Sequence, residues 1–309
     1  MNLKISIGMP VYNGEKFIRN SLDSILSQTF RDFELIISDN ASTDSTSSIC
    51  QEYARNDVRI RYIRQNRNMG SIWNLNFVLQ EAKYGYFFWA AVDDYWLSTF
   101  IEKNIRVLEF DKTIIGSISD VELYRKFTDV SKPNINDPSN RNVRKYQYVH
   151  PTTGSIEKRV RVYLKFFQAS IIYGIYRTDV LKKSCISDNF WANDLAIVLN
   201  TLKYGNLNVI DEILMYRFVP DGSSISLIQY QLRAKIPIIK IIFLEFPFTI
   251  WFLKNFDFKI FIKNIHIFVK LNLRGEYVVF NETVRIIKRI IFRQDKFYKF
   301  SKNILKPLN

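Results

Sequence analysis

Short apolar runs alternate with amphipathic stretches along the first third of the chain. The runs have the length of strands, and the apolar residues between them recur every three or four positions, as in helices. The predicted order is strand 4–9, helix 15–28, strand 33–38, helix 44–55, strand 58–64, helix 71–82 and strand 86–92. Strands that alternate with helices in this way form a parallel sheet with helices on both faces. The predicted fold class is therefore α/β, with a doubly wound, mostly parallel sheet.

The alternation becomes irregular after residue 110. The segment 128–148 is polar and contains Pro133 and Pro138, so we expect a long loop of the kind that often lies over an active site. The other elements expected here are helix 97–110, strand 113–124, helix 155–167, strand 171–176, a helix starting at Thr178, a helix that opens at 190–194 and ends near 204, and strands 207–210 and 213–218.

The C-terminal part differs in composition from the rest. Residues 228–309 hold 16 Lys and Arg against 5 Asp and Glu, a net charge of +11, whereas residues 1–227 carry only +3 of the total of +14. Charged residues and prolines interrupt 236–253, so it does not match the roughly 20 apolar residues of a spanning helix. Helical patterns at 256–273 and 283–300 mix Ile and Phe with Lys and Arg, which is typical of a helix lying on an anionic membrane. The alternative is a helical subdomain packed on the core, with a solvated basic face.

Two domains follow from this division, residues 1–227 and the basic amphipathic region 228–309. Two cysteines provide no disulfide framework, and the two histidines, His150 and His266, are too far apart for a His-rich zinc site. The first residues enter a strand pattern without the features of a signal peptide. We therefore expect a cytoplasmic protein that is peripheral on the inner face of the cell membrane.

Two adjacent carboxylates, Asp93 and Asp94, follow the apolar run 86–92. Strands of an open α/β sheet present ligands at their carboxyl ends. Hard divalent cations take oxygen ligands, and Mg²⁺ is commonly held by one or two carboxylates together with substrate phosphates. One interpretation is a site for a metal and a diphosphate. The other is structural, because Asp is a favoured N-cap residue and a helix is expected to begin near Leu97.

Polar residues also follow the other predicted strands, namely Tyr12 and Asn13, Asp39, and the loop 66–70. This set suits a nucleotide diphosphate, since an aromatic ring can stack on a base and a carboxylate can accept from a base N–H. The chain contains neither G-x-G-x-x-G nor G-x-x-x-x-G-K-[ST], so a Rossmann dinucleotide site and a P-loop are unsupported. A phosphate without a glycine cradle needs another counter-charge, which a metal on Asp94 would supply.

Five short segments resemble those of the family-2 glycosyltransferases in order and spacing. They lie within about residues 3–110 and are 10–15 (PVYNGE), 24–29 (SILSQT), 39–44 (DNASTD), 68–70 (NMG) and the pair Asp93 and Asp94. The resemblance implies a GT-A fold, with a donor half at about 1–110 and an acceptor half at about 111–227. It also favours the metal interpretation of the Asp pair over the helix cap.

The resemblance assigns roles to individual donor-side residues. Tyr12 and Asp39 match positions that contact the nucleobase, Asp93 matches a position near the ribose, and Asp94 matches the metal ligand of a D-x-D-like motif. The other positions that it places in the donor site are Pro10, Asn13, Glu15, Asn68 and Gly70. This copy reads Ala91-Val92-Asp93-Asp94, so the first acid of a full D-x-D is absent and Asp93 is a second candidate metal ligand. The implied cofactor is Mg²⁺ or Mn²⁺.

The second half resembles the family more loosely. Segments 174–177 and 191–195 look like the acceptor side, and Asp194 matches the general base of an inverting transferase, although an N-cap role is the alternative. Arg217 lies in a stretch that resembles one near the diphosphate and could pair with phosphate; the alternative is a surface arginine. The His that many relatives carry shortly after this Arg is absent.

The function expected from these features is an inverting, metal-dependent glycosyltransferase in bacterial polysaccharide biosynthesis. It would use a nucleotide-diphosphate sugar, with UDP- or dTDP-sugars favoured, and a glycan or lipid-linked acceptor, and it would contact the membrane through 228–309. A nucleotidyltransferase would need a basic or Gly-rich triphosphate loop, which 12–15 does not provide. The remaining alternatives are an inactive relative and a protein that binds nucleic acid through its basic tail. Because the tail's cations alternate with Ile and Phe, a lipid surface is favoured and no nucleic acid is expected.

Overall fold

The computed structural model describes residues 3–124, 145–218 and 243–304, with side chains of the last helix described up to residue 284. The chain separates into two compact units, Met1–Ser224 and Ile225–Asn309. This boundary and the predicted one after residue 227 both fall within 219–242, outside the described ranges.

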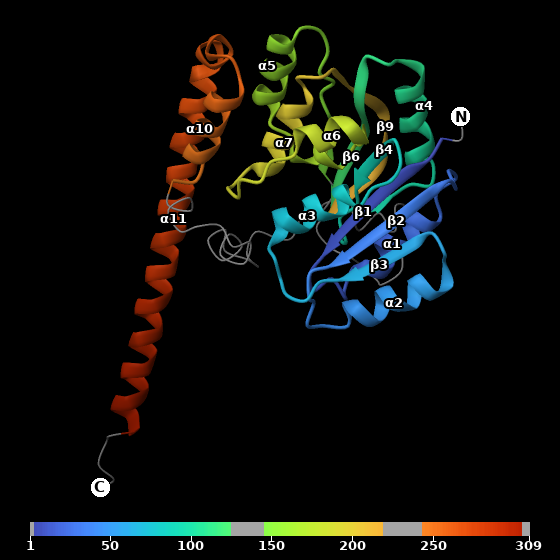
Figure 1. Cartoon of the computed structure of the whole chain (residues 1–309). Coiled ribbons are helices and arrows are strands. Elements are labelled where there is room, and N and C mark those ends of the chain that lie inside the picture. Colours follow the sequence, from blue (N-terminus) through green and yellow to red (C-terminus); the bar gives the residue numbers. More distant parts are fainter. Residues whose placement is uncertain (1–2, 125–144, 219–242, 305–309) are drawn as a thin grey trace. The chain divides into compact units, whose positions relative to one another are not determined.

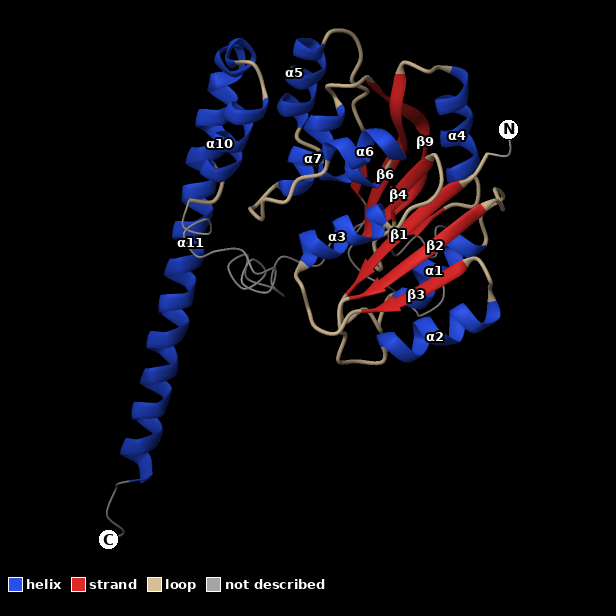
Figure 2. Ribbon diagram, in the orientation of Figure 1, coloured by secondary structure: helices blue, strands red, loops and turns tan. Residues whose placement is uncertain are grey.

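The first unit begins with the predicted alternation of strands and helices. The strands are β1 (Ile5–Val11), β2 (Phe33–Asp39), β3 (Ile60–Arg64) and β4 (Tyr86–Trp89), and the helices are α1 (Ile18–Leu26), α2 (Thr46–Asn56) and α3 (Ser71–Gln80). The four strands are parallel and lie in the order β3-β2-β1-β4, which Figure 2 shows as neighbouring arrows for β1, β2 and β3. The central strands are buried on both faces, which is why their sequences are continuous apolar runs rather than alternating ones.

The second half of this unit extends the same sheet in mixed directions. Its strands are β5 (Tyr95–Trp96), β6 (Ile114–Tyr124), β7 (Lys145–Gln147), β8 (Ile175–Arg177) and β9 (Asn206–Phe218). β6 and β9 are parallel to each other, whereas β8 runs antiparallel between β4 and β6. β5 and β7 are also antiparallel to their partners, so six of the nine strands of the described sheet run in one direction. The prediction of a mostly parallel sheet is confirmed.

Helices and one 3₁₀ turn surround this second half. They are α4 (Phe100–Phe110), α5 (Ile156–Phe166), the 3₁₀ helix η2 (Ala169–Tyr173), α6 (Thr178–Ser184) and α7 (Asn193–Thr201). α5 has the features of a capped helix, because the Ser155 side chain accepts from the Lys158 backbone N–H and Phe167 ends it in the left-handed region.

Several predicted elements of this unit differ from those in the structure. The strand expected at 171–176 is wrong in part, because apolar residues up to Tyr173 form η2 and only Ile175–Arg177 pair in the sheet. The strands expected at 207–210 and 213–218 form one strand, β9, whose pairing with β6 shifts register around Asp120. The loop expected at 128–148 contains β7 at its end, and its part within 125–144 lies outside the described residues.

The second unit is described as two helices, α10 (Phe246–Asn255) and α11 (Phe258–Ile304), shown side by side in Figure 1. Phe248, Phe252 and Phe268 form an aromatic core between them, with the Phe252 and Phe268 ring centroids 4.7 Å apart. The two helices expected at 256–273 and 283–300 are one continuous helix, because no proline separates the two patterns and the single glycine between them, Gly275, packs closely against Glu245. Among the described residues, none of the helices is both long enough and apolar enough to cross a bilayer.

Candidate active site

The parallel strands β1, β2, β3 and β4 end along one edge of the sheet, at Val11, Asp39, Arg64 and Trp89. Ligands of open α/β sheets bind outside these carboxyl ends. β9 runs in the same direction and brings Arg217, near its end, to this edge. Residues that are far apart in the sequence therefore converge here.

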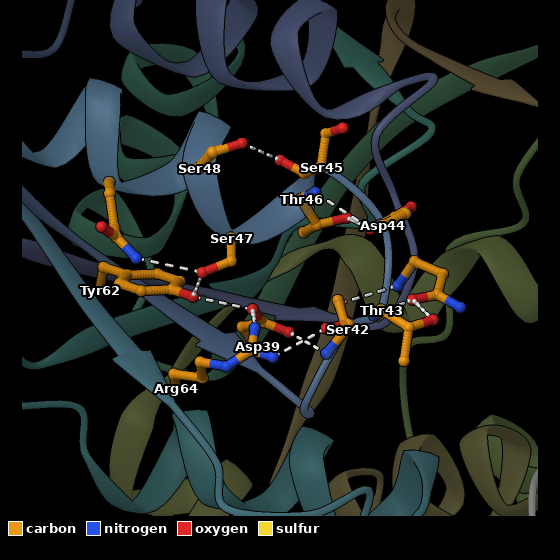
Figure 3. Close-up of polar contacts among 12 residues, drawn as sticks. Asp39, Ser42, Thr43, Asp44, Ser45, Thr46, Ser47, Ser48, Tyr62 and Arg64 are labelled. Carbon is orange, nitrogen blue, oxygen red and sulfur yellow. Dashed lines mark hydrogen bonds and ion pairs between the residues drawn. The ribbon is translucent and has the colours of Figure 1, made fainter.

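The loop after β1 is hydrogen-bonded to the loop after β2. The Asn13 N–H donates to Ser42 Oγ (2.9 Å), and Asn13 Oδ1 accepts from the Thr43 N–H (2.8 Å). Glu15 Oε2 accepts from the Ser45 N–H (2.9 Å). Figure 3 shows polar contacts within the loop after β2 and the start of α2. The Asn13 and Glu15 side chains, which the sequence places in the donor site, thus hold the two loops together, and their contact with a donor stays a prediction.

Thr46 joins these loops from the first residue of α2. Its buried Oγ1 accepts from the Gly14 N–H (2.8 Å) and donates to Asp44. In Thr46→Val, the Gly14 N–H loses its partner in a buried position. An unsatisfied buried donor costs ~1–3 kcal/mol, so we expect the free energy of unfolding in urea to fall by about that amount.

The matched control is Ser48→Ala, which removes an exposed hydroxyl from the same helix that donates to the Ser45 carbonyl. A surface change of this kind is expected to stay within about 0.5 kcal/mol of the wild type. Equal unfolding midpoints for Thr46→Val and Ser48→Ala would contradict the loop coupling.

Asp39 is fully buried at the end of β2, and donors already engage its carboxylate. Oδ1 accepts from the Ser42 N–H (2.8 Å), and Oδ2 accepts from the Tyr62 hydroxyl and from Arg64 Nη1, each at 2.7 Å. These contacts are drawn in Figure 3. Contact of Asp39 with a nucleobase stays a prediction, and Arg64, whose side chain is 42% exposed, presents a cation beside it.

Sequence reasoning gave no role to Tyr62 or to Arg64. A signal was available, because residues two apart on a strand face the same side of the sheet. Tyr62 and Arg64 are two apart on β3 and face Asp39 on the neighbouring strand. The pattern could have suggested that Tyr62 and Arg64 share a partner, although not that this partner is Asp39.

Asn40 connects this loop to the one that precedes α3. Its side chain donates to Asn68 Oδ1 and to the Gly70 carbonyl, each at 3.1 Å, and accepts from the Met69 N–H at 2.8 Å. Gly70 has a φ of +96°, which disfavours a side chain at the start of α3. Asn68 and Gly70 therefore shape the loop beside Asp39.

Two further predicted donor-site residues lie at the end of β1. Pro10 is within the strand, and Tyr12 is the first residue after it. The Tyr12 side chain is 47% exposed, so its ring is accessible for stacking.

Asp93 and Asp94 do not cap a helix. α4 begins at Phe100, and its N-cap residue is Thr99, so the structural alternative for the pair is wrong. Asp94 is only 2% exposed, and its Oδ1 accepts from the Phe218 N–H (3.0 Å). Within the described ranges, Oδ2 of Asp94 is buried without a hydrogen-bond partner. Such an orphaned carboxylate oxygen fits a cation ligand.

Burial is the main cause that raises the pKa of Asp94 well above its usual value, and the charge of Asp93 adds to it. Burial also raises the pKa of Asp93, which is partly exposed. The nearby Arg217 acts in the opposite direction on both carboxylates. The backbone of Asp93 is held by Tyr124, whose hydroxyl donates to the Asp93 carbonyl (2.8 Å).

Arg217 is the cation at the centre of this cluster. Burial lowers its pKa, but Tyr173 and the charges of Asp94, Asp194 and Asp93 outweigh that effect, and the net change is upward. The guanidinium lies 5.1 Å from the Tyr173 ring centroid, and Nη1 donates to Ser170 Oγ (3.2 Å). Arg217 is therefore not a surface arginine. Ser170 and Tyr173, both on η2, are site residues that the sequence did not indicate: Tyr173 was expected in the strand 171–176, and Ser170 was assigned to no element.

Asp194 lies in the first turn of α7, but the N-cap position belongs to Ala192. Its N-cap alternative is therefore wrong, and Oδ1 accepts instead from the adjacent Leu195 N–H (2.9 Å). The residue is partly exposed, yet enough protein surrounds the carboxylate for burial to raise its pKa, against the effect of Arg217. A carboxylate with a raised pKa that faces a site is suited to general base chemistry.

The cluster has three carboxylates against one guanidinium, an excess of negative charge that favours a divalent cation. In the part of the chain that the structure describes, no group of three or more His, Cys, Asp and Glu side chains could hold a metal. A cation at Asp94 and Asp93 would therefore take further ligands from a bound phosphate, which is the usual arrangement for Mg²⁺.

The sequence model described as glycosyl transferase family 2 matches residues 6–167, more than half of the chain. The chain belongs to this family. Among curated relatives, the Escherichia coli "UDP-Glc:alpha-D-GlcNAc-diphosphoundecaprenol beta-1,3-glucosyltransferase WfaP" is 35% identical over 112 residues, 36% of this chain and 44% of that protein. "Putative glycosyltransferase EpsE" of Bacillus subtilis is 36% identical over 107 residues, 34% of this chain and 38% of that protein. Each match spans less than half of the relative's length.

Two solved structures share the fold. TarS 1-349 of S. aureus, in complex with UDP-GlcNAc, has a TM-score of 0.53 and 20% identity, and the match covers 76% of this chain and 61% of that one. The mannosyltransferase PcManGT of Pyrobaculum calidifontis, in complex with GDP-Man and Mn²⁺, has a TM-score of 0.56 and 14% identity, covering 92% and 75%. The predicted GT-A-like fold and the family resemblance are confirmed.

Proposed function

We propose that this chain is an inverting, metal-dependent glycosyltransferase that moves a sugar from a nucleotide-diphosphate sugar to a glycan acceptor in bacterial polysaccharide biosynthesis. The observation that carries the proposal is the buried Oδ2 of Asp94, which has no hydrogen-bond partner among the described residues, together with the half-buried Arg217, whose charge acts on Asp93, Asp94 and Asp194. A transferase of this kind needs a cation site for the diphosphate and a separate carboxylate for the acceptor. UDP- or dTDP-sugars are the favoured donors, and TarS in its complex with UDP-GlcNAc supports a donor of this class.

The acceptor hydroxyl attacks the anomeric carbon from the face opposite the diphosphate, and Asp194 takes its proton. The bond from the anomeric carbon to the diphosphate oxygen breaks, and the nucleoside diphosphate leaves with the electron pair. Arg217 pairs with the diphosphate as its charge develops. Asp94, with Asp93, would hold Mg²⁺ or Mn²⁺, which would offset the same charge. Tyr12 stacks on the base, and the Asp39 and Arg64 pair lies beside it.

The acceptor is proposed to be lipid-linked, with the protein peripheral on the inner face of the cell membrane. The printed name of WfaP describes transfer to a diphosphoundecaprenol-linked sugar, which supports this acceptor class. The net charge of +11 over residues 228–309 supports attraction to anionic lipids. In this proposal residues 1–227 are the catalytic domain, with donor half 1–110 and acceptor half 111–227, and residues 228–309 contact the membrane.

A donor screen tests the proposal. The full chain, with Mg²⁺ or Mn²⁺, is titrated with UDP-, dTDP- and GDP-sugars while thermal unfolding and slow donor hydrolysis are followed. A donor at 100 times its Kd stabilises the native state by ~2.7 kcal/mol, so one nucleotide class should raise the melting temperature clearly. EDTA should remove most of that shift, because Asp94 then lacks the cation that the diphosphate shares. A well-folded protein that responds to none of the donors would favour an inactive relative.

A further inference from the structure

The first part of α11 packs against α10 through one face. Ile260, Asn264 and Phe268 are buried there, and Asn272 Nδ2 donates to Thr249 Oγ1 (2.8 Å). Gly275 lies so close to the start of α10 that a Cβ would come within 2.8 Å of Glu245 Cγ. This face therefore has its partner within the unit.

A second apolar face runs along the same helix and is exposed. Its seven large side chains are between 43% and 68% exposed, and they are Phe258, Ile262, Ile265, Val269, Leu273, Tyr277 and Phe280. At about 100° per residue, they fall within an arc of roughly 120°. We call this set the apolar stripe. Scattered exposed apolar residues are ordinary, but seven large ones gathered on one side of a helix mark a contact surface.

A row of exposed cations flanks the apolar stripe. Lys259, Lys263, Lys270 and Arg274 occupy one edge of it, and the exposed His266 and Glu276 fall within the arc of the stripe itself. In the sequence, basic and apolar residues recur every eleven positions. Basic residues at this interval are Lys263, Arg274, Arg285 and Lys296, and apolar residues at this interval are Phe258, Val269, Phe280 and Ile291.

The interval of eleven residues argues against an ordinary left-handed coiled coil as the partner. It corresponds to about 3.67 residues per turn, close to the 3.6 of a straight helix, so the apolar stripe stays on one side of the axis. The seam of an ordinary left-handed coiled coil instead repeats every seven residues. A straight apolar row with cations beside it matches the surface of an anionic bilayer, which offers an apolar interior to the row and phosphates to the cations. Nucleic acid offers phosphates for the cations but no apolar layer for the stripe.

We propose that α11 lies along the surface of an anionic bilayer, with the apolar stripe in the interface and the basic row at the lipid phosphates. This inference rests on the proposed membrane association and deepens it by naming the contact face. It makes the long helix a surface-bound element, which is consistent with the absence of a spanning helix among the described residues.

Vesicle co-sedimentation of the full chain tests whether the apolar stripe is the surface that contacts lipid. Phosphatidylcholine vesicles with and without phosphatidylglycerol are compared for the wild type and the double variant Val269→Glu with Leu273→Glu. Losing two apolar contacts is expected to weaken binding to anionic vesicles at least ~10-fold. Replacing Lys263 and Arg274 by Gln should weaken binding about fivefold per charge on anionic vesicles only.

The matched control is Val58→Glu with Phe110→Glu, two exposed apolar residues of the first unit that receive the same new charges. It should bind like the wild type, and circular dichroism should show unchanged helix content in every variant. If the wild type binds vesicles and the stripe variant binds equally well, the face is wrong while membrane association stands. If the wild type binds no vesicles, the membrane association itself fails. A dimer in light scattering that the stripe variant dissociates, without vesicle binding, would assign the stripe to a second copy instead.

Discussion

Asp94→Asn is expected to reduce sugar transfer by about 10²–10⁴-fold without lowering the melting temperature at pH 7. Under the proposed function the loss follows because an amide at this position would be a poor ligand for the cation that the buried Oδ2 would hold, and metal stabilisation of a leaving diphosphate is worth several kcal/mol. Stability is expected to hold because Asp94 is buried next to Asp93, and removing one of two adjacent carboxylates lowers their mutual repulsion. Transfer is measured with the donor identified by the screen, and stability by thermal unfolding.

The control for this variant is Asp32→Asn, which changes an exposed carboxylate in the same unit. Its activity and melting temperature should match the wild type. A fall of several degrees for Asp94→Asn would instead assign the carboxylate a structural role, through the hydrogen bond from the Phe218 N–H. Full activity would remove Asp94 from the metal site.

The first half of the site was predictable because its residues follow strands of one parallel sheet. The ends of such strands meet at one edge, so Tyr12, Asp39 and the Asp93 and Asp94 pair could be placed together from the pattern alone. What the pattern could not supply was the division of labour among the polar residues. Asn13 and Glu15 hold the loops through hydrogen bonds across about 30 residues of sequence, and no local periodicity reports such contacts.

The second half was harder because its strands are short, antiparallel or irregular. Ala169–Tyr173 is apolar enough to suggest a strand, yet it forms a 3₁₀ helix that brings Ser170 and Tyr173 to Arg217. The antiparallel β8 enters the sheet between β4 and β6 through three residues only. The half-buried position of Arg217 therefore depends on tertiary packing, which no periodic pattern in a single sequence reports.

Asp194→Asn is expected to lower the transfer rate by about 10²–10⁴-fold while donor binding stays near the wild-type level. This range is the usual contribution of a positioned general base, which acts on the acceptor and not on the nucleotide. Donor binding is followed by thermal shift and transfer by product formation. Asp94→Asn should weaken both, so the two variants separate the roles of the two carboxylates. An active Asp194→Asn variant would exclude Asp194 as the base.

The pH dependence provides a second test of the same carboxylate. Burial raises the pKa of Asp194, and a base works only when ionised, so wild-type transfer should fall as pH decreases through a value above the ordinary range of Asp. The contribution of Asp194 to the free energy of unfolding changes with pH in the opposite direction. A raised folded-state pKa gives stability that is present below the unfolded value and is lost as pH rises through the folded value. Asp194→Asn should therefore be at least as stable as the wild type at pH 7 to 8 and lose its advantage in acid. A variant that is less stable at neutral pH would show that the ionised carboxylate holds the fold through Arg217 rather than serving the reaction.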